Sequence, residues 1–147
     1  MNAADHVEGQ GTSGAEASAY WILTGLLAAE LLLGGIWDVA RTRHVVEVIT
    51  QLGYPVYILI ILGIWKLLAV PALLAPRLPL LKEWAYAGVF FEMTGAAVSH
   101  MARGGDSEII VTLVTAALAV VSWWLRPAGR RCLPSPRWQH RRRNERA

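Results

Sequence analysis

Residues 20–39 read YWILTGLLAAELLLGGIWDV, an almost continuously apolar run with aromatic residues near both ends. A helix rises about 1.5 Å per residue, so about 20 residues match the hydrocarbon core of a bilayer, which is roughly 30 Å thick. Tyr and Trp gather where a membrane meets water, as Tyr20, Trp21 and Trp37 would here. The run therefore predicts a helix that spans a membrane.

Three further apolar runs, at residues 54–75, 84–102 and 109–125, have similar lengths and are separated by short polar turns. The chain of 147 residues is 54% hydrophobic and only 17% charged, which is unusual for a soluble domain. Four spans of about 20 residues each leave no room for a separate soluble catalytic domain. We therefore expect an all-α integral membrane protein that folds as a four-helix bundle.

The segments outside the four apolar runs are predicted to form a short helix and two tails. Residues 45–52 carry apolar side chains at near-helical spacing among polar ones, which predicts a short interfacial helix between the first two spans. Residues 1–19 are rich in Gly, Ala and Ser and predict a mobile tail, whereas residues 127–147 form a basic tail. The expected transmembrane domain therefore covers residues 20–126.

Lys and Arg are concentrated on one side of the expected membrane, and cytoplasmic segments retain such charge. With four spans, both tails share a side with the turn between the second and third spans. That side holds Arg77, Lys82 and the arginines from Arg126 onward, against Arg41, Arg43 and Arg103 on the other. Both termini are therefore expected in the cytoplasm, in a bacterial-type inner membrane. The basic tail would then contact anionic lipid headgroups, and no nucleic-acid-binding module accompanies it.

Glu30, Lys66 and Glu92 lie inside the expected spans, where an ionisable side chain is costly unless it is paired or hydrated. Counted from the cytoplasmic ends of their spans, all three fall about 12–15 Å deep. The lysine could neutralise one carboxylate and donate to both, while a proton could balance the second. We therefore predict that these three are the candidate catalytic residues. The alternative is a polar clasp that only fixes helix packing.

A second group of polar and aromatic side chains lies toward the outer ends of the spans. Trp37, Asp38, Tyr57 and His100 are expected to line the mouth of a pocket, and Trp65, beside the intramembrane lysine, completes the predicted ligand-binding set. Aromatic and ionisable groups at such positions suit contact with a ligand.

Metal and disulfide chemistry find little support in the sequence. His44 and His100 are the histidines expected on the outer side, and no metal-ligand spacing recurs, so no metal site is predicted. A haem held between two spans would need a second intramembrane histidine. Cys132 is the single cysteine, so the chain can form no internal disulfide, and no cofactor can be named.

Four stretches have a characteristic order and spacing: residues 52–55 (LGYP), 65–68 (WKLL), 76–88 (PRLPLLKEWAYAG) and 99–100 (SH). Together they resemble the DoxX-like family of small four-span membrane proteins. The resemblance extends over about residues 18–126 and implies a four-helix membrane bundle. Relatives in this family include subunits of quinone-linked sulfur oxidation, redox-stress membrane complexes and a receptor-assembly chaperone.

Two classes of function remain open from the sequence. In the first, the bundle binds a lipid-soluble small molecule of quinone or isoprenoid type in an intramembrane polar pocket. Such a pocket could support acid/base chemistry, as in an isomerase or cyclase, or quinone-linked redox chemistry. In the second, the chain is a non-catalytic assembly or structural subunit of a larger membrane complex, or forms a homo-oligomer. Whether the protein is an enzyme is left undecided.

Overall fold

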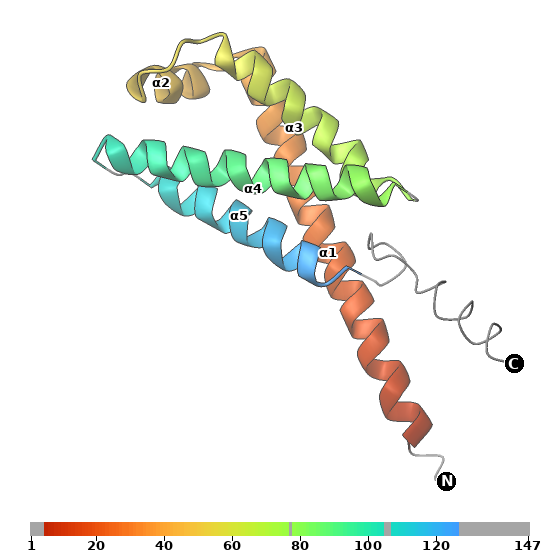
Figure 1. The fold of residues 1–147 in the computed structure, drawn as a ribbon. Helices are drawn as coiled ribbons and strands as arrows, with labels where there is room; N and C mark the ends of the chain where they lie inside the picture. The colour runs from red at the N-terminus through yellow and green to blue at the C-terminus, as the bar shows by residue number, and fades with distance from the viewer. Residues whose placement is uncertain (1–4, 77, 105–106, 127–147) are drawn as a thin grey trace, which may run out of the picture.

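The computed structural model describes residues 5–76, 78–104 and 107–126, with side chains from Gly14 onward. Five helices make up this part of the chain, and it contains no strand (Figure 1). They are α1 Asp5–Ala40, α2 Arg43–Gln51, α3 Ile58–Leu74, α4 Pro79–Ala102 and α5 Glu108–Trp124. The prediction of an all-α fold is confirmed.

The helices follow the apolar runs of the sequence closely. α3, α4 and α5 coincide with the second, third and fourth runs, and the short helix predicted between the first two runs is α2. α1 begins at Asp5, so it includes residues that the sequence assigned to the amino-terminal tail. The basic tail, residues 127–147, lies outside the described residues.

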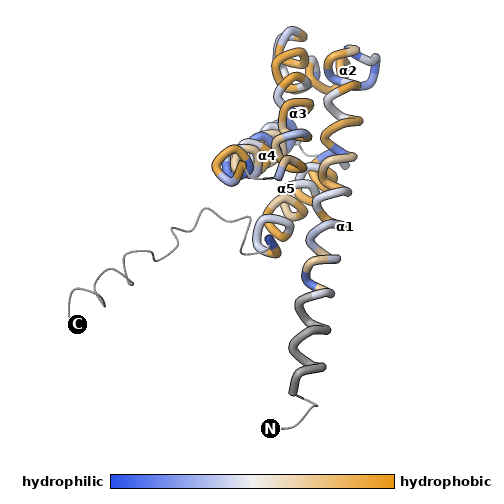
Figure 2. Tube along the Cα trace, turned by 90° about the vertical axis from the view of Figure 1, so that its right-hand side faces the viewer, coloured by the Kyte–Doolittle hydropathy of each residue, from blue (hydrophilic) through white to orange (hydrophobic). Residues whose placement is uncertain are grey.

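Length and hydropathy distinguish α1 from the other helices. Its segment Gly14–Ala40 is the one helix of the described chain that is both long and apolar enough to cross a membrane. α3 and α5 are apolar but have 17 residues each, and α4 has 24 residues with several charged side chains. Figure 2 shows apolar residues along α3 and along the part of α1 beside it. The chain therefore has a membrane-compatible hydropathy, with one clear candidate span.

The carboxyl ends of α1 and α2 are each followed by a residue with left-handed backbone. Arg41, with φ of 50°, follows α1, and Gly53, with φ of 86°, follows α2. At each point the next amide donates to a carbonyl five residues back, at 3.2 Å for Thr42 and 3.0 Å for Tyr54. This is the Schellman arrangement, which satisfies carbonyls that a helix end leaves unpaired. Glycine suits the second site because the Arg103 guanidinium occupies the place of a side chain.

α1 and α3 pack backbone to backbone. A Cβ on Gly63 would lie 2.8 Å from the carbonyl oxygen of Gly35 and 2.9 Å from the amide nitrogen of Val39. No side chain fits at this crossing, so glycine there permits the close approach. The apolar core lies between α1, α3, α4 and α5 and consists of Leu27, Leu31, Leu73, Tyr86, Val89, Met93, Ala116 and Ala119.

A buried hydroxyl network joins three of the helices at the other end of the bundle. Ser122 of α5 is 2.7 Å from the Thr24 hydroxyl of α1 and 2.8 Å from the Tyr86 hydroxyl of α4. Lys82 is only 1% exposed and donates to the Leu73 carbonyl at the end of α3. The sequence had counted this lysine as part of a loop, but its ammonium lies in the bundle, where it satisfies a helix-terminal carbonyl.

Candidate functional site

Lys66 of α3 is the centre of a charged cluster between three helices. Its Nζ is 2.8 Å from Asp38 Oδ2, in the last turn of α1, and 3.4 Å from Glu92 Oε1, midway along α4. The three side chains are 14%, 8% and 17% exposed, respectively. Ion pairs this enclosed form only where both partners are held in place, because desolvation of each charge is costly.

Glu30 approaches the same cluster from α1. It precedes Asp38 by eight residues with Gly34 between them, so all three lie on one face of the helix. A Cβ on Gly34 would be 3.8 Å from Lys66 Nζ and 3.9 Å from Glu30 Oε1, so both charged groups flank the space that this glycine leaves. Glu30 Oε2 is buried and has no hydrogen-bond partner among the described residues.

The structure thus brings the three predicted catalytic side chains together, and it adds Asp38 as the nearest partner of the lysine. Depth counting had placed Asp38 in a separate outer group, but the long lysine stem carries the ammonium toward that end of the bundle. The spacing of eight residues puts Glu30 and Asp38 on one face of the helix, and this signal could have grouped Asp38 with the three predicted residues.

A wide cavity of about 610 Å³ opens beside the cluster. Six of the predicted site residues line it: Glu30, Trp37, Asp38, Lys66, Glu92 and His100. The sequence analysis did not predict five further polar lining residues, His44, Tyr54, Ser99, Glu108 and Thr112. They come from the ends of α2, α4 and α5 and the loop before α3, so only tertiary structure brings them together. Cavities that bind small ligands have volumes of about 300–1,000 Å³.

Two polar contacts hold the outer rim of the wide cavity. The Tyr54 hydroxyl is 2.9 Å from Ser99 Oγ, joining the loop before α3 to α4. His44 Nε2 is 3.7 Å from Glu108 Oε1, joining α2 to α5. These contacts place α2 across the end of the cavity as part of its wall.

Two predicted ligand-binding residues lie outside the wide cavity. Tyr57 is 65% exposed and lines none of the cavities described here. Trp65 lines a second, mostly apolar cavity of about 350 Å³, which we call the α3–α4 groove. Its lining residues are Leu62, Trp65, Lys66, Leu68, Ala69, Ala72, Leu81, Trp84, Ala85, Gly88, Val89 and Glu92.

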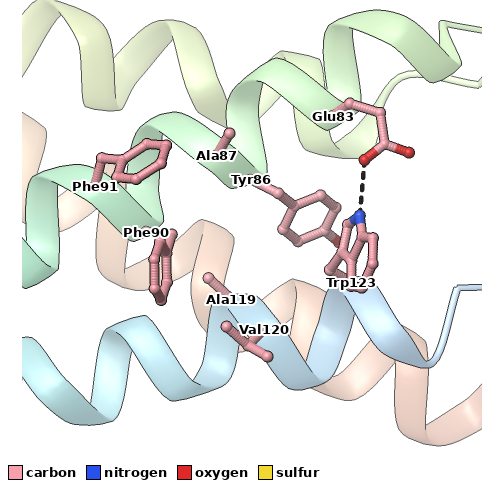
Figure 3. A pocket seen from close by; sticks show the side chains of 8 residues that line it. All are labelled: Glu83, Tyr86, Ala87, Phe90, Phe91, Ala119, Val120 and Trp123. Carbon is pink, nitrogen blue, oxygen red and sulfur yellow. Dashed lines mark hydrogen bonds between the residues drawn. The ribbon is translucent and has the colours of Figure 1, made fainter.

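A third cavity of about 270 Å³ lies between α4 and α5 (Figure 3). Phe90, Phe91 and Val120 give it apolar walls, and at one end Trp123 Nε1 donates to Glu83 Oε2 over 2.7 Å. The Glu83 carboxylate also accepts from Arg126, so these polar groups are bonded to one another. This cavity therefore lacks the converging polar groups of the Lys66 cluster.

Among the residues that the structure describes, no group of three or more His, Cys, Asp and Glu side chains is arranged to hold a metal ion. The polar cluster is organised around an ammonium instead. Its chemistry is therefore that of hydrogen bonding and ion pairing between carboxylates and a lysine.

An apolar helical chain with an enclosed ionic cluster between its helices is the pattern of a membrane protein with a polar intramembrane site. A family model described as the DoxX-like family matches residues 22–122. The protein belongs to the DoxX-like family, which confirms the resemblance seen in its sequence. No curated protein and no solved structure matches the chain.

Proposed function

We propose that this membrane protein binds a lipid-soluble small molecule, of quinone or isoprenoid type, in the wide cavity beside Lys66. The observation that carries the proposal is the coincidence of an enclosed ionic cluster with a cavity of ligand size. If the charged side chains served helix packing alone, apolar side chains of similar volume would stabilise the core at least as well. Their presence beside an open cavity therefore favours a role in binding.

The proposal gives each charged side chain a role. Lys66 Nζ is the donor that would meet an oxygen of the ligand, and Asp38 and Glu92 hold this ammonium in place over 2.8 and 3.4 Å. Glu30, with an oxygen that lacks a donor, is the group best suited to accept a proton or a hydrogen bond from the ligand. Acid/base chemistry at the site would use this carboxylate.

We also propose that the protein crosses a bacterial-type inner membrane four times, with both termini in the cytoplasm. α3 and α5 would each span about 26 Å at 1.5 Å per residue, near the lower limit for a bilayer core. Aromatic side chains at their ends, among them Tyr54, Tyr57 and Trp124, suit the two interfaces. The excess of Lys and Arg on the side of the termini supports the orientation.

Cysteine labelling tests this topology. In a background in which Cys132 is replaced by serine, Ser107→Cys should react with a membrane-impermeant maleimide added to intact cells, whereas Thr12→Cys should react only after lysis. Labelling of Thr12→Cys in intact cells, or protection of Ser107→Cys, would show a different number of spans or the opposite orientation.

The binding proposal is tested by what remains bound to the protein after gentle extraction. Mass spectrometry of the purified wild-type protein should detect a hydrophobic small molecule, and Lys66→Met should lose at least about 90% of it, equivalent to a tenfold weaker binding. Lys82→Met is the matched control, because it removes the other buried lysine but lines none of the described cavities. Equal retention in Lys66→Met and wild type contradicts the proposal.

The second candidate is an assembly or structural subunit of a membrane complex. The observation that favours it is the direct pairing of Lys66 with two carboxylates, which could fix the register of α1, α3 and α4 without a ligand. If no small molecule is detected with the wild-type protein, and replacing Glu30, Lys66 and Glu92 by Leu, Met and Leu leaves its complexes intact, this second function is supported.

A further inference from the structure

The wide cavity and the α3–α4 groove adjoin at the charged cluster. Leu62, Lys66 and Glu92 line both of them. In Figure 1, α3 and α4 meet near their connecting turn and diverge toward the end where α2 lies. The groove occupies the narrow part and the wide cavity the broad part, so the Lys66–Glu92 pair marks the junction between two chambers.

The two chambers differ sharply in chemistry. Apart from the shared Lys66 and Glu92, the groove is lined by aliphatic and aromatic residues and glycine. Trp65 and Trp84 at its rim are 65% and 68% exposed, so the groove opens on the outer surface of the helices. In a membrane that surface faces lipid tails. The groove therefore offers an apolar path from the bilayer to the charged cluster.

The cluster needs hydrogen-bond donors more than it needs acceptors. Three carboxylates, those of Glu30, Asp38 and Glu92, surround one ammonium, which already donates to Asp38 and approaches Glu92. Glu30 Oε2 is buried without a donor among the described residues. A buried acceptor left unpaired is costly, and an anion placed here would add to an excess of negative charge.

We propose that one amphiphile occupies both chambers: its hydrogen-bond-donating hydroxyl head lies in the wide cavity against Glu30, and its apolar tail lies in the α3–α4 groove. This inference rests on the proposed function and narrows the ligand class. Within the quinone and isoprenoid types it selects hydroxylated forms, such as a quinol or an isoprenoid alcohol. Amphiphiles with an anionic head are rejected.

The dimensions of the two chambers suit an amphiphile with a single hydrocarbon tail. The groove extends along α3 from Leu62 to Ala72, which is about 15 Å of helix at 1.5 Å per residue. Its volume of about 350 Å³ lies at the lower end of the range for ligand cavities, whereas the wide cavity lies in the middle. A slender tail and a bulkier polar head match this division.

Two glycines allow each chamber to be blocked separately, and a third provides a control. A Cβ on Gly88, which lines the groove, or on Gly95, which lines the wide cavity, would meet no atom within 4 Å. Gly25 of α1 is equally open but lines none of the described cavities. Leucine at these positions should therefore be accommodated by the fold, and leucine also favours helix more than glycine does.

The experiment uses the full chain in phosphatidylcholine nanodiscs and three probes that carry a photoreactive diazirine in the tail: dodecanol, dodecylamine and dodecyl phosphate. Mass spectrometry locates the cross-links. We expect the alcohol probe to label residues that line the groove, and the phosphate probe to label them about tenfold less. Labelling by the amine probe without the alcohol probe would overturn the hydroxyl head.

The glycine variants separate this inference from the proposed function. Gly88→Leu should reduce groove labelling about tenfold and Gly25→Leu should leave it unchanged, with helix content checked by circular dichroism. If Gly88→Leu keeps full retention of the native small molecule while Gly95→Leu and Lys66→Met lose it, the tail site is wrong and the proposed function stands. If none of these variants changes groove labelling or ligand retention, the tail site and the proposed function are both wrong. Equal groove labelling by the phosphate probe overturns the choice of head.

Discussion

The crossing of α1 and α3 at Gly63 sets the position of Lys66 one turn later, and it can be perturbed by a single methyl group. In Gly63→Ala the new Cβ would lie 2.8 Å from the carbonyl oxygen of Gly35. Non-bonded carbon contacts are favourable at about 3.5–4.0 Å, so the two helices would have to separate by roughly 0.7 Å or more. The Val39 Cγ2 atom also lies 2.8 Å from the new Cβ, but the Gly35 oxygen and the Val39 nitrogen belong to the backbone and cannot rotate away.

The expected loss of stability follows from two opposing effects. Overpacking costs about 1–3 kcal/mol, and alanine in place of glycine within a helix returns about 1 kcal/mol. Because the obstacle is backbone, we take the upper part of the range and expect Gly63→Ala to be about 2 kcal/mol less stable than wild type. The displaced α3 should also lengthen the 2.8 Å contact between Lys66 and Asp38 and weaken ligand retention.

The assay is unfolding of the detergent-solubilised protein by increasing sodium dodecyl sulfate, followed by circular dichroism. Gly25→Ala is the matched control, because its Cβ meets no atom within 4 Å, and it should be as stable as wild type or more stable by up to about 1 kcal/mol. A Gly63→Ala protein as stable as Gly25→Ala would refute the close α1–α3 packing and, with it, the geometry of the charged cluster.

Four other substitutions test three separate parts of the structure. Ser122→Ala removes a buried hydroxyl bonded to both α1 and α4 and should cost about 1–3 kcal/mol in the same unfolding assay. Tyr54→Phe removes a bond to Ser99 in a more exposed setting and should cost less than about 0.5 kcal/mol; equal costs for the two would contradict the described burial. Asp38→Asn should reduce retention of the bound small molecule more than Glu92→Gln does, because Asp38 lies closer to Lys66 Nζ; the reverse order would show that Lys66 pairs mainly with Glu92.

The sequence predicted the helical segments well because long apolar runs bounded by polar turns leave few alternatives in a chain this hydrophobic. It also predicted that Glu30, Lys66 and Glu92 would converge, since an unpaired charge inside a bundle is too costly to leave alone. Both results follow from the high cost of isolated polar groups away from water.

The features that the sequence did not predict depend on the direction and length of individual side chains. The free-energy cost of isolating a polar group does not determine them. Depth counting treats a side chain as if it ended at its Cα, but the lysine stem is long enough to meet Asp38 on a different level. Lys82 was taken as a loop charge because it follows a proline-containing turn, whereas the turn of the helix directs it inward to the Leu73 carbonyl. Tyr57 was expected at the mouth from its position in the chain, yet its side chain lies outside the cavity. These outcomes depend on the rotation of each helix about its own axis, which apolar runs of nearly uniform hydropathy do not encode.

An experimental structure of the wild-type protein, purified with its native lipids and reconstituted in nanodiscs, tests the central claim most directly. We expect density in the wide cavity that reaches hydrogen-bonding distance of Lys66 Nζ or Glu30, in a bundle whose α1, α3, α4 and α5 all cross the disc. A closed bundle whose side chains fill that cavity, with Lys66 contacting only its carboxylate partners, would contradict the claim.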